Sequence, residues 1–445
     1  RPRPLTATGV IDDPGIVVVP AALGLVAGLT LHRILPVLMR LVAGLLGRTR
    51  STALYLAAKR SSRATASFRW PLLLVVVATS LAAFLASLSL SLERQLVDDT
   101  YLTVGADHAA EQFVRPGATL ATAADYEALP GVAAATTTLE LDGQLDGAGG
   151  EPVRVLAVDV ATYGTAVHWQ SWYDDETLGD LLTVLQGAPD HVIVSESLIE
   201  RSGLRVGDDL TYAVGVGFTP DFRTRLLTTT GSVVATTRHF PRWAGAERAP
   251  LLVANVEYLA AQADVEATTT LLRSVEPGAV VEPPFRARDT SAGGQLAAVR
   301  DQPERQGVFG ILTASFLAST ALAGLALVLH SVFSYRERSV EVGILRAGGL
   351  GSGELGRLVG FDAVVTGAVG VGVGAATGIA ASRWLVTDVV ATIESTAPAE
   401  ARIAWGPTLS VAGAFVLTLV VIAVVTTPLL TRLRVFQAIK LGEQL

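Results

Sequence analysis

Two long uncharged apolar runs enclose a polar block of about two hundred residues, and this arrangement constrains the fold more than any other feature of the chain. The runs cover residues 71–92 and 306–334, and the block between them covers residues 93–305. Each run exceeds the ~20 residues that a helix needs to cross a hydrocarbon core ~30 Å thick. The sequence therefore predicts a membrane protein with a large domain outside the bilayer.

Three further apolar runs, residues 15–31, 363–382 and 403–431, bring the expected number of membrane crossings to five. Lys and Arg near helix ends favour the cytoplasmic side. Residues 33–69 contain eight Lys and Arg residues and no acidic residue, and further Arg residues follow in 335–357 and in the C-terminal tail. These segments are predicted to be cytoplasmic, which leaves the N-terminus and the polar block outside.

The predicted fold is an α-helical transmembrane bundle of about five spans with a large mixed α/β extracytoplasmic domain. The chain opens without Met or a signal-peptide pattern, so we expect it to be the C-terminal part of a longer polypeptide. The expected divisions are an outer start and first helix that close an earlier membrane unit (1–35), a basic cytoplasmic linker with helical character at the interface (36–69), a transmembrane helix (70–92), the outer domain (93–305) and a part with three transmembrane helices (306–445).

The outer block is strongly acidic, with 15 Arg and no Lys against 31 Asp and Glu residues, a net charge of −16. This charge disfavours nucleic acid and anionic lipid surfaces as partners. It suits a cationic or neutral ligand, although a dispersed acidic surface more often serves solubility alone. The chain contains no cysteine, which excludes disulfides and thiolate metal ligands, and its six histidines lack the spacing of metal ligands. No metal site is therefore expected.

Several short segments of the outer block carry strand and helix signals. Ser195 stands at the start of a predicted helix that stops at Gly203, and Asn255 starts another that runs to about residue 263. Val206-Gly207-Asp208 predicts a turn into the next strand. Apolar or alternating runs predict strands at residues 151–158, 190–194, 211–216 and 251–256.

No pattern in the chain predicts catalysis, and we expect no catalytic residues. Asp190 and His191 precede Ser195, but they lie along one strand and its helix cap without a G-x-S-x-G elbow. The glycine cluster at 348–353 has no following Lys, so it does not form a phosphate-binding loop.

Aromatic side chains form the most specific candidate for a ligand surface in the outer block. Trp169, Trp172 and Tyr173 stand beside the acidic residues 174–176. Aromatic rings beside carboxylates suit a cationic or amphipathic ligand. A core or interdomain contact is the alternative interpretation of the same three residues.

Glycines recur along one expected membrane helix, at Gly367, Gly370, Gly374 and Gly378. Gly370 and Gly374 form a G-x-x-x-G pair that Gly378 continues, and such spacing lets two helices approach closely. The pattern predicts tight helix packing, either within the chain or with a second copy.

Two stretches resemble known permease families. Residues 192–210, with Val194-Ser195, Leu198, Gly203-Leu204 and Val206-Gly207-Asp208, resemble the periplasmic core domain of MacB-like transporter permeases. Residues 335–351, which read YRERSVEVGILRAGGLG, resemble the signature of FtsX-like permeases and lead into the glycine-rich helix. The closing residues 435–443 resemble the tail of the same family, although its proline is replaced.

The FtsX-like resemblance implies a surface that couples the membrane helices to a cytoplasmic ATPase. On that resemblance, the coupling residues are Arg336, Arg338, Glu341, Gly343, Ile344, Leu345, Arg346 and Gly349. Ala347 also matches the signature.

The resemblance further implies an ABC transporter permease in the bacterial inner membrane, acting as a homodimer or a paired permease unit among membrane lipids. ATP and Mg²⁺ would be bound by the separate ABC ATPase, and this chain would hold no cofactor. The expected activity is export or extraction of a lipid, lipoprotein, peptide or drug. A signalling role towards an extracytoplasmic partner such as a cell-wall hydrolase remains open, as does a static binding protein.

Overall fold

The chain forms two compact units in the computed structural model. The membrane unit comprises Arg1–Glu93, Pro303–Ile393 and Ala399–Leu445, and the α/β unit comprises Arg94–Gln302 and Glu394–Pro398. The structure describes residues 15–46, 59, 69–113, 119–146, 150–218, 224–243, 249–276, 279, 281, 287–303, 306–307, 309–322, 324–325, 328, 351–390 and 402–432.

Long helices make up the described part of the membrane unit: α1 (Gly15–Leu46), α3 (Arg69–Val104), α11 (Ser352–Val390), α12 (Trp405–Arg432) and a helix over residues 309–322. Three segments are long and apolar enough to cross a membrane, namely Val19–Leu41, Leu72–Val104 and Gly367–Val386. Shorter apolar helices, Phe309–Leu322 and Trp405–Thr418, lie in the other two runs where crossings are expected. The chain is therefore a membrane protein with an α/β unit.

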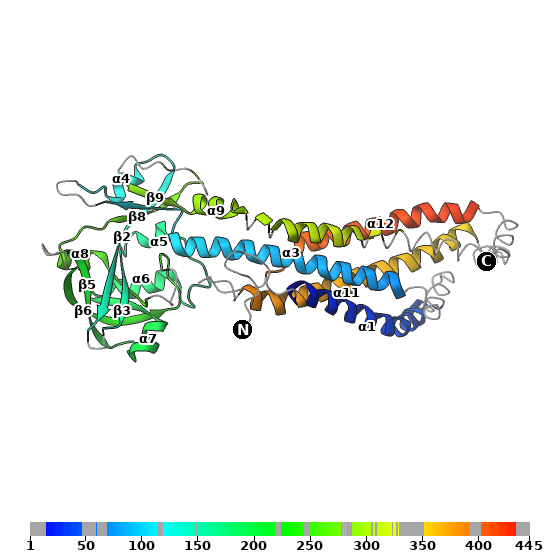
Figure 1. The fold of residues 1–445 in the computed structure, drawn as a ribbon, viewed down its shortest axis with the longest axis horizontal. Coiled ribbons are helices and arrows are strands. Elements are labelled where there is room, and N and C mark those ends of the chain that lie inside the picture. Colours follow the sequence, from blue (N-terminus) through cyan, green and yellow to red (C-terminus); the bar gives the residue numbers. More distant parts are fainter. Residues whose placement is uncertain are drawn as a thin grey trace. The chain divides into compact units, whose positions relative to one another are not determined.

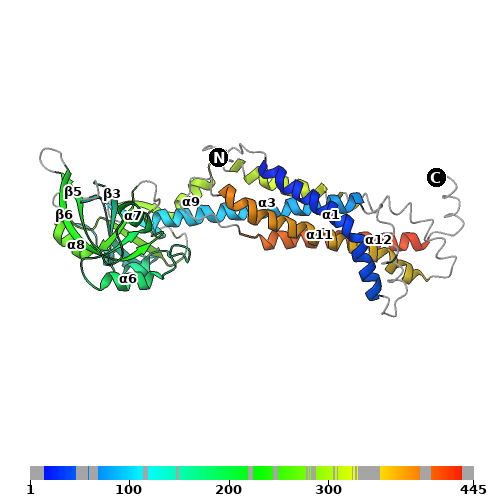
Figure 2. The same cartoon turned by 90° about the horizontal axis from the view of Figure 1, so that it is seen from below.

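Helix α1 continues beyond residue 31, where the first apolar run was expected to end. Leu31, Leu35, Met39 and Ala43 recur every fourth residue and are all buried, so one face of the helix packs on its neighbours beyond that point. The helix predicted at the start of the basic linker is the continuation of α1, which ends at Leu46. Pro36 lies inside the helix and removes one backbone donor. Figure 2 shows α1 changing direction in its second half.

The described residues of the α/β unit contain nine strands and six short helices. The strands are β1 (His108–Gln112), β2 (Val132–Leu145), β3 (Pro152–Val158), β4 (His191–Ser195), β5 (Asp209–Phe218), β6 (Thr224–Thr237), β7 (Leu251–Asn255), β8 (Thr269–Ser274) and β9 (Ala287–Ser291). The helices are α4 (Ala123–Glu127), α5 (Tyr163–Ala166), α6 (Leu178–Gln186), α7 (Glu196–Ser202), α8 (Val256–Ala263) and α9 (Ala292–Arg300). Figure 1 shows α6, α7 and α8 gathered around the strands.

The strand pairings close on themselves. The order is β3-β7-β4-β6-β5-β2-β8-β1-β9, and β3 also pairs with β2. The long strand β2 therefore joins β3 to β5, and six strands form a closed ring from which β8, β1 and β9 extend. Closure leaves these six strands without a free edge, which protects them from pairing with another chain.

Both faces of strand β3 are buried, which explains its nearly continuous apolar sequence. Val153, Val155 and Ala157 pack in one core cluster with α7 and α8. Leu156 and Val158 belong to a second cluster, to which α6 contributes four leucines. Successive side chains of a strand point to opposite faces, so one strand serves both cores.

The local signals of the sequence are confirmed at the helix ends. Gly203 ends α7 in the left-handed conformation (φ 72°), and the Asn255 side chain accepts a hydrogen bond from the Glu257 N–H at the start of α8. Ser195 is the N-cap residue of α7, but its hydroxyl makes no capping bond. It instead accepts a hydrogen bond from the Leu251 N–H (3.0 Å), which extends the contact between β4 and β7.

Candidate functional site

Helix α11 packs on α3 through its glycines. A Cβ on Gly374 would overlap the Thr79 hydroxyl, and a Cβ on Gly378 would overlap the Ser80 carbonyl oxygen. Gly370 lies one turn earlier against Leu72 and Val75, so the two helices run parallel. Figure 1 shows α3 and α11 side by side. Only glycine permits this approach, because any larger residue would separate the backbones.

Helix α1 packs on α3 through a second glycine pair, which we had not singled out in the sequence. A Cβ on Gly28 would lie 2.7 Å from Leu73 Cδ2, and one on Gly24 would lie 3.2 Å from Ser80 Cβ. The later glycine of α1, Gly28, meets Leu73, and the earlier one, Gly24, meets Ser80. Helix α1 therefore runs antiparallel to α3. Gly24 and Gly28 have the same G-x-x-x-G spacing as the α11 pair, so the signal was present in the sequence.

The start of α12 is tied to α3 by two serine hydroxyls. The Arg402 N–H donates to Ser91 Oγ (2.9 Å) and the Ala404 N–H donates to Ser87 Oγ (3.3 Å). Backbone donors before a helix have no partner within the helix and need one inside a membrane protein. The order of these contacts shows that α12 runs antiparallel to α3.

These directions bring four chain segments to one end of the membrane unit. The end of α1, the start of α3, the start of α11 and the end of α12 all lie there. The expected basic linker 36–69, the basic segment 335–357 and the C-terminal tail overlap or directly adjoin those helix ends in the sequence.

The end of α3 is held firmly within the α/β unit. The Tyr101 hydroxyl donates to Asp107 Oδ1 (3.2 Å), and Asp107 Oδ2 accepts from the Ser274 N–H and hydroxyl. The Asp107 carbonyl accepts from the Ala292 N–H (2.9 Å), the first residue of α9. His108 pairs with Ser291 in the β1–β9 ladder. The two chain connections that bound residues 94–302 of the α/β unit therefore start from neighbouring strands.

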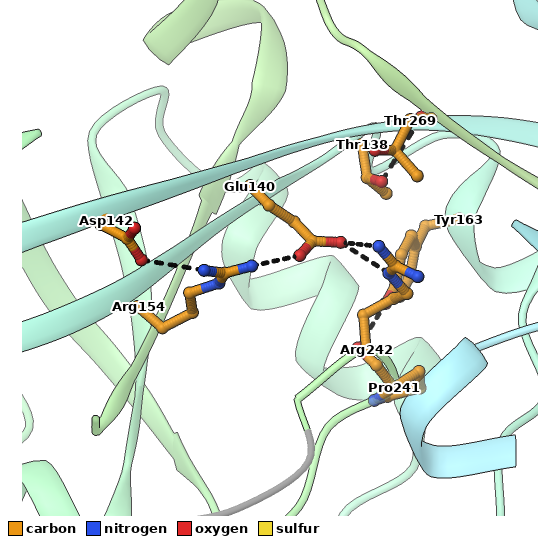
Figure 3. Close-up of polar contacts among 8 residues, drawn as sticks. All are labelled: Thr138, Glu140, Asp142, Arg154, Tyr163, Pro241, Arg242 and Thr269. Carbon is orange, nitrogen blue, oxygen red and sulfur yellow. Dashed lines mark hydrogen bonds and ion pairs between the residues drawn. The ribbon is translucent and has the colours of Figure 1, made fainter. Parts of the chain in front are cut away.

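A polar network lies next to this attachment (Figure 3). Glu140 on β2 accepts from Arg242 Nε (2.6 Å) through one carboxylate oxygen and from Arg154 through the other (2.7 Å). Arg154 on β3 also reaches Asp142 (2.8 Å). The Glu140 side chain is 14% exposed and the Asp142 side chain is 90% exposed, so the network runs from the interior to the surface.

The aromatic residues predicted as a ligand surface are largely packed into the core. Tyr173 is fully buried and therefore offers no ligand surface. Trp169 packs against the core cluster of α6, and its ring lies edge-on to Tyr173 (5.2 Å). Trp172 is half-buried between Tyr173 (4.5 Å) and His239 (5.1 Å). The remaining exposed parts of the two tryptophans stay a predicted ligand surface.

The residues of the rejected triad do not form a catalytic arrangement. Ser195 is buried and bonded to the Leu251 backbone, and His191 Nδ1 lies 2.7 Å from the Val184 carbonyl oxygen. In the described part of the chain, no group of three or more His, Asp and Glu side chains is placed to hold a metal ion.

The predicted coupling residues Arg336 to Gly349 lie outside the described residues. Gly367 lies within α11, one turn before Gly370.

Comparison with known proteins identifies the C-terminal part of the chain. Residues 313–435 match the model of the FtsX-like permease C-terminal family. These residues form an FtsX-like permease domain. Within it lie α11, with its glycine contacts, and α12, with its tie to α3.

A solved structure also matches part of the chain. A crystal structure of the extracellular domain of a noncanonic ABC-type transporter, YknZ from Gram-positive bacteria, is 9% identical and covers 44% of this chain and 96% of its own, with a TM-score of 0.23. No curated protein matches the chain.

Proposed function

We propose that the chain is the transmembrane permease subunit of an ABC transporter and that a separate cytoplasmic ATPase drives it. The FtsX-like permease domain supports the permease assignment. ATP and Mg²⁺ would be bound by the ATPase, and residues 336–349 would form its docking surface. The resemblance of residues 192–210 to MacB-like permeases belongs to the same proposal.

One observation carries this proposal: the helix contacts bring the attachment points of all the basic segments to the same end of the membrane unit. Basic segments favour the cytoplasm, so that end is assigned to the cytoplasmic side. The opposite directions of α1 and α3 and of α11 and α12 support alternating crossings; with the helix over residues 309–322 the proposal has five crossings in a bacterial inner membrane, with the acidic α/β unit outside. A homodimer or a paired permease unit would complete the transporter.

Purification of the complex through a tag after Leu445 tests the assignment. We expect an ABC ATPase to co-purify and its ATP hydrolysis to be stimulated by the permease. Recovery of the chain without a nucleotide-binding partner, in detergents that preserve such complexes, would favour a static binding protein instead.

Charge reversal in the docking surface tests its location. Glu341→Arg and Arg346→Glu are expected to insert into the membrane normally and to lose the stimulation of ATP hydrolysis. Arg383→Glu is the matched control, because Arg383 lies towards the opposite end of α11. Stimulation at the wild-type level in both docking variants would contradict the location.

We propose that the coupled motion exports or extracts an amphipathic substrate, such as a lipid, lipoprotein, peptide or drug. ATP-dependent release of a labelled phospholipid or peptide from vesicles that contain the complex tests this step. ATP hydrolysis without release of any labelled substrate would instead favour a signalling role, in which the α/β unit acts on an extracytoplasmic partner such as a cell-wall hydrolase.

A further inference from the structure

Arg242 has an unusual backbone conformation next to the end of α3. Its φ is 75°, in the left-handed region that residues other than glycine rarely occupy. Its N–H donates to the Leu102 carbonyl oxygen (2.9 Å), which lies in the last turn of α3. A strained conformation of this kind persists only where the surrounding contacts enforce it, and such positions concentrate at functional sites.

The side chain of Arg242 connects the same place to the sheet. Its guanidinium donates through Nε to Glu140 Oε1 (2.6 Å), and a second nitrogen pairs with the same oxygen. The two side chains are only 17% and 14% exposed, so water screens this ion pair weakly. Charge-assisted bonds of a planar guanidinium are directional, and they fix where Glu140 and β2 lie.

Arg242 also touches the residue that ends α3. Gly105 has a φ of 85° and its N–H donates to the Tyr101 carbonyl oxygen (2.8 Å), as in a helix that ends on a left-handed glycine. A Cβ on Gly105 would lie 2.7 Å from Arg242 Cγ. The stem of Arg242 therefore occupies the space that the missing side chain leaves.

The turn that carries Arg242 is itself fixed on both sides. The Tyr163 hydroxyl donates to the Pro241 carbonyl oxygen (3.2 Å), and the Phe240 ring stacks on Tyr163 (5.6 Å). Trp243 Nε1 donates to the Ala249 carbonyl oxygen (3.1 Å). The contacts of its neighbours thus hold the backbone of Arg242 in place, and its side chain joins the end of α3 to β2.

We propose that Arg242 is a positioning residue that, with Glu140, latches the last turn of α3 to β2, so that a displacement of α3 reaches the sheet. Helix α3 belongs to both units, because it begins at Arg69 in the membrane unit and ends at Val104 in the α/β unit. The inference rests on the proposed function, which requires a motion of the membrane helices to change the α/β unit.

The distance between two spin labels measures how closely α3 is held to β2. Because the chain contains no cysteine, labels attach only to cysteines that are introduced. Thr103→Cys on α3 and Gln144→Cys on β2 are both exposed sites for labels. In the full chain in lipid nanodiscs, we expect a narrow distribution of distances between them. Arg242→Gly removes the guanidinium and relieves the backbone strain, since glycine adopts a positive φ freely. This variant should broaden the distribution.

Two further variants separate positioning from general stability. Arg242→Lys keeps a charge near Glu140 and should restore part of the narrow distribution. Arg238→Ala, four residues away, removes an ion pair between Arg238 and the exposed Asp175 and should leave the distribution unchanged. The melting temperature of each variant is measured as well. A distribution in Arg242→Gly as narrow as in the wild type would overturn the latch.

The complex purified with its ATPase gives the functional readout. In the wild type, ATP with vanadate should shift the distance between a label on α3, at Thr103→Cys, and a label on α6, at Thr183→Cys. Arg242→Gly should hydrolyse ATP and lose that shift. An undiminished shift in this variant would overturn the inference, whereas absence of any shift in the wild type would count against the proposed function.

Discussion

The membrane unit and the α/β unit are held together by different kinds of contact. In the membrane unit, α3 meets α11 and α1 at glycines, where the backbones nearly touch. In the α/β unit, the strands close into a ring, and apolar clusters lie on both faces of the sheet. Lipid gives no hydrophobic driving force for helices to associate, so close packing stabilises the membrane unit. Burial of apolar side chains from water stabilises the α/β unit. The two units should therefore respond differently to the same kind of substitution.

Adding volume should damage the membrane unit most. Gly374→Leu places a side chain where Thr79 and the Val76 carbonyl oxygen already lie, so α11 must move away from α3. We expect a loss of about 3 kcal/mol or more in stability, measured by thermal unfolding in detergent. Gly372→Leu is the matched control, because a Cβ there meets nothing within 4 Å. Equal losses of stability in the two variants would show that the close approach of α11 to α3 does not stabilise the membrane unit.

Removing volume should damage the α/β unit most. Leu181 on α6 is fully buried in the core cluster of β4 and β7. Leu181→Ala should lower the free energy of unfolding by about 2–5 kcal/mol, because a cavity replaces the lost contacts. Val184→Ala on the same helix, where the side chain is 40% exposed, should cost much less. Denaturant unfolding of the full chain measures both.

Removing one hydroxyl in the membrane unit should have a smaller effect. Ser91→Ala leaves the Arg402 N–H without its acceptor at the start of α12. We expect a loss of about 1 kcal/mol, as is typical of hydrogen bonds between membrane helices. Thr30→Val is the control, because the Thr30 hydroxyl bonds within its own helix to the Val26 carbonyl oxygen. No loss of stability in Ser91→Ala beyond that of the control would show that the tie to α12 contributes nothing.

The smallest expected effect is a dependence on pH that belongs to the α/β unit. Both ring nitrogens of the buried His108 face acceptors, Asp289 Oδ2 (3.0 Å) and the Ala279 carbonyl oxygen (2.9 Å), and Asp107 adds a nearby negative charge. The hydrogen bond to Asp289 raises the pKa of His108, although burial acts against it. A raised pKa in the folded state stabilises the protein below the unfolded pKa, and this contribution is lost as pH rises through the folded pKa.

Hydrogen exchange of β1 and β9 measures this pH dependence in the full chain. The difference in protection between the wild type and His108→Gln should be largest at low pH and should shrink as pH rises. Taking the difference removes the opposite contribution of His168, whose pKa burial lowers. A difference that grows with pH would contradict the assignment of a protonated His108.

Local signals in the sequence predicted parts of both units. Contacts between residues far apart in the sequence were not predicted. Gly203 and Asn255 were predicted as helix ends because a cap depends on a few adjacent residues. The closure of the sheet depends on β2 pairing with both β3 and β5, and no local pattern reports it. The left-handed Arg242 was also not predicted, because its conformation depends on Leu102 and Glu140, which are far away in the sequence.

The membrane unit shows the same limit in another form. The α11 glycines were identified from their spacing, but the sequence does not say which helix they meet. In the structure the α11 glycines pack against α3. Gly24 and Gly28 of α1 also pack against α3. The aromatic cluster shows the reverse case, because acidic neighbours suggested an exposed surface for Tyr173, which lies in the core.

The pairing of His108 with Ser291 places the entrance and the exit of residues 94–302 on adjacent strands. A domain whose two ends lie together can be inserted into a loop of another protein, or taken out of it, without stretching its host. Residues 94–302 therefore have the form of an interchangeable module. A pair of membrane helices that accepts one such module would accept another whose ends have the same spacing, which offers a route to new partners while the membrane helices stay unchanged.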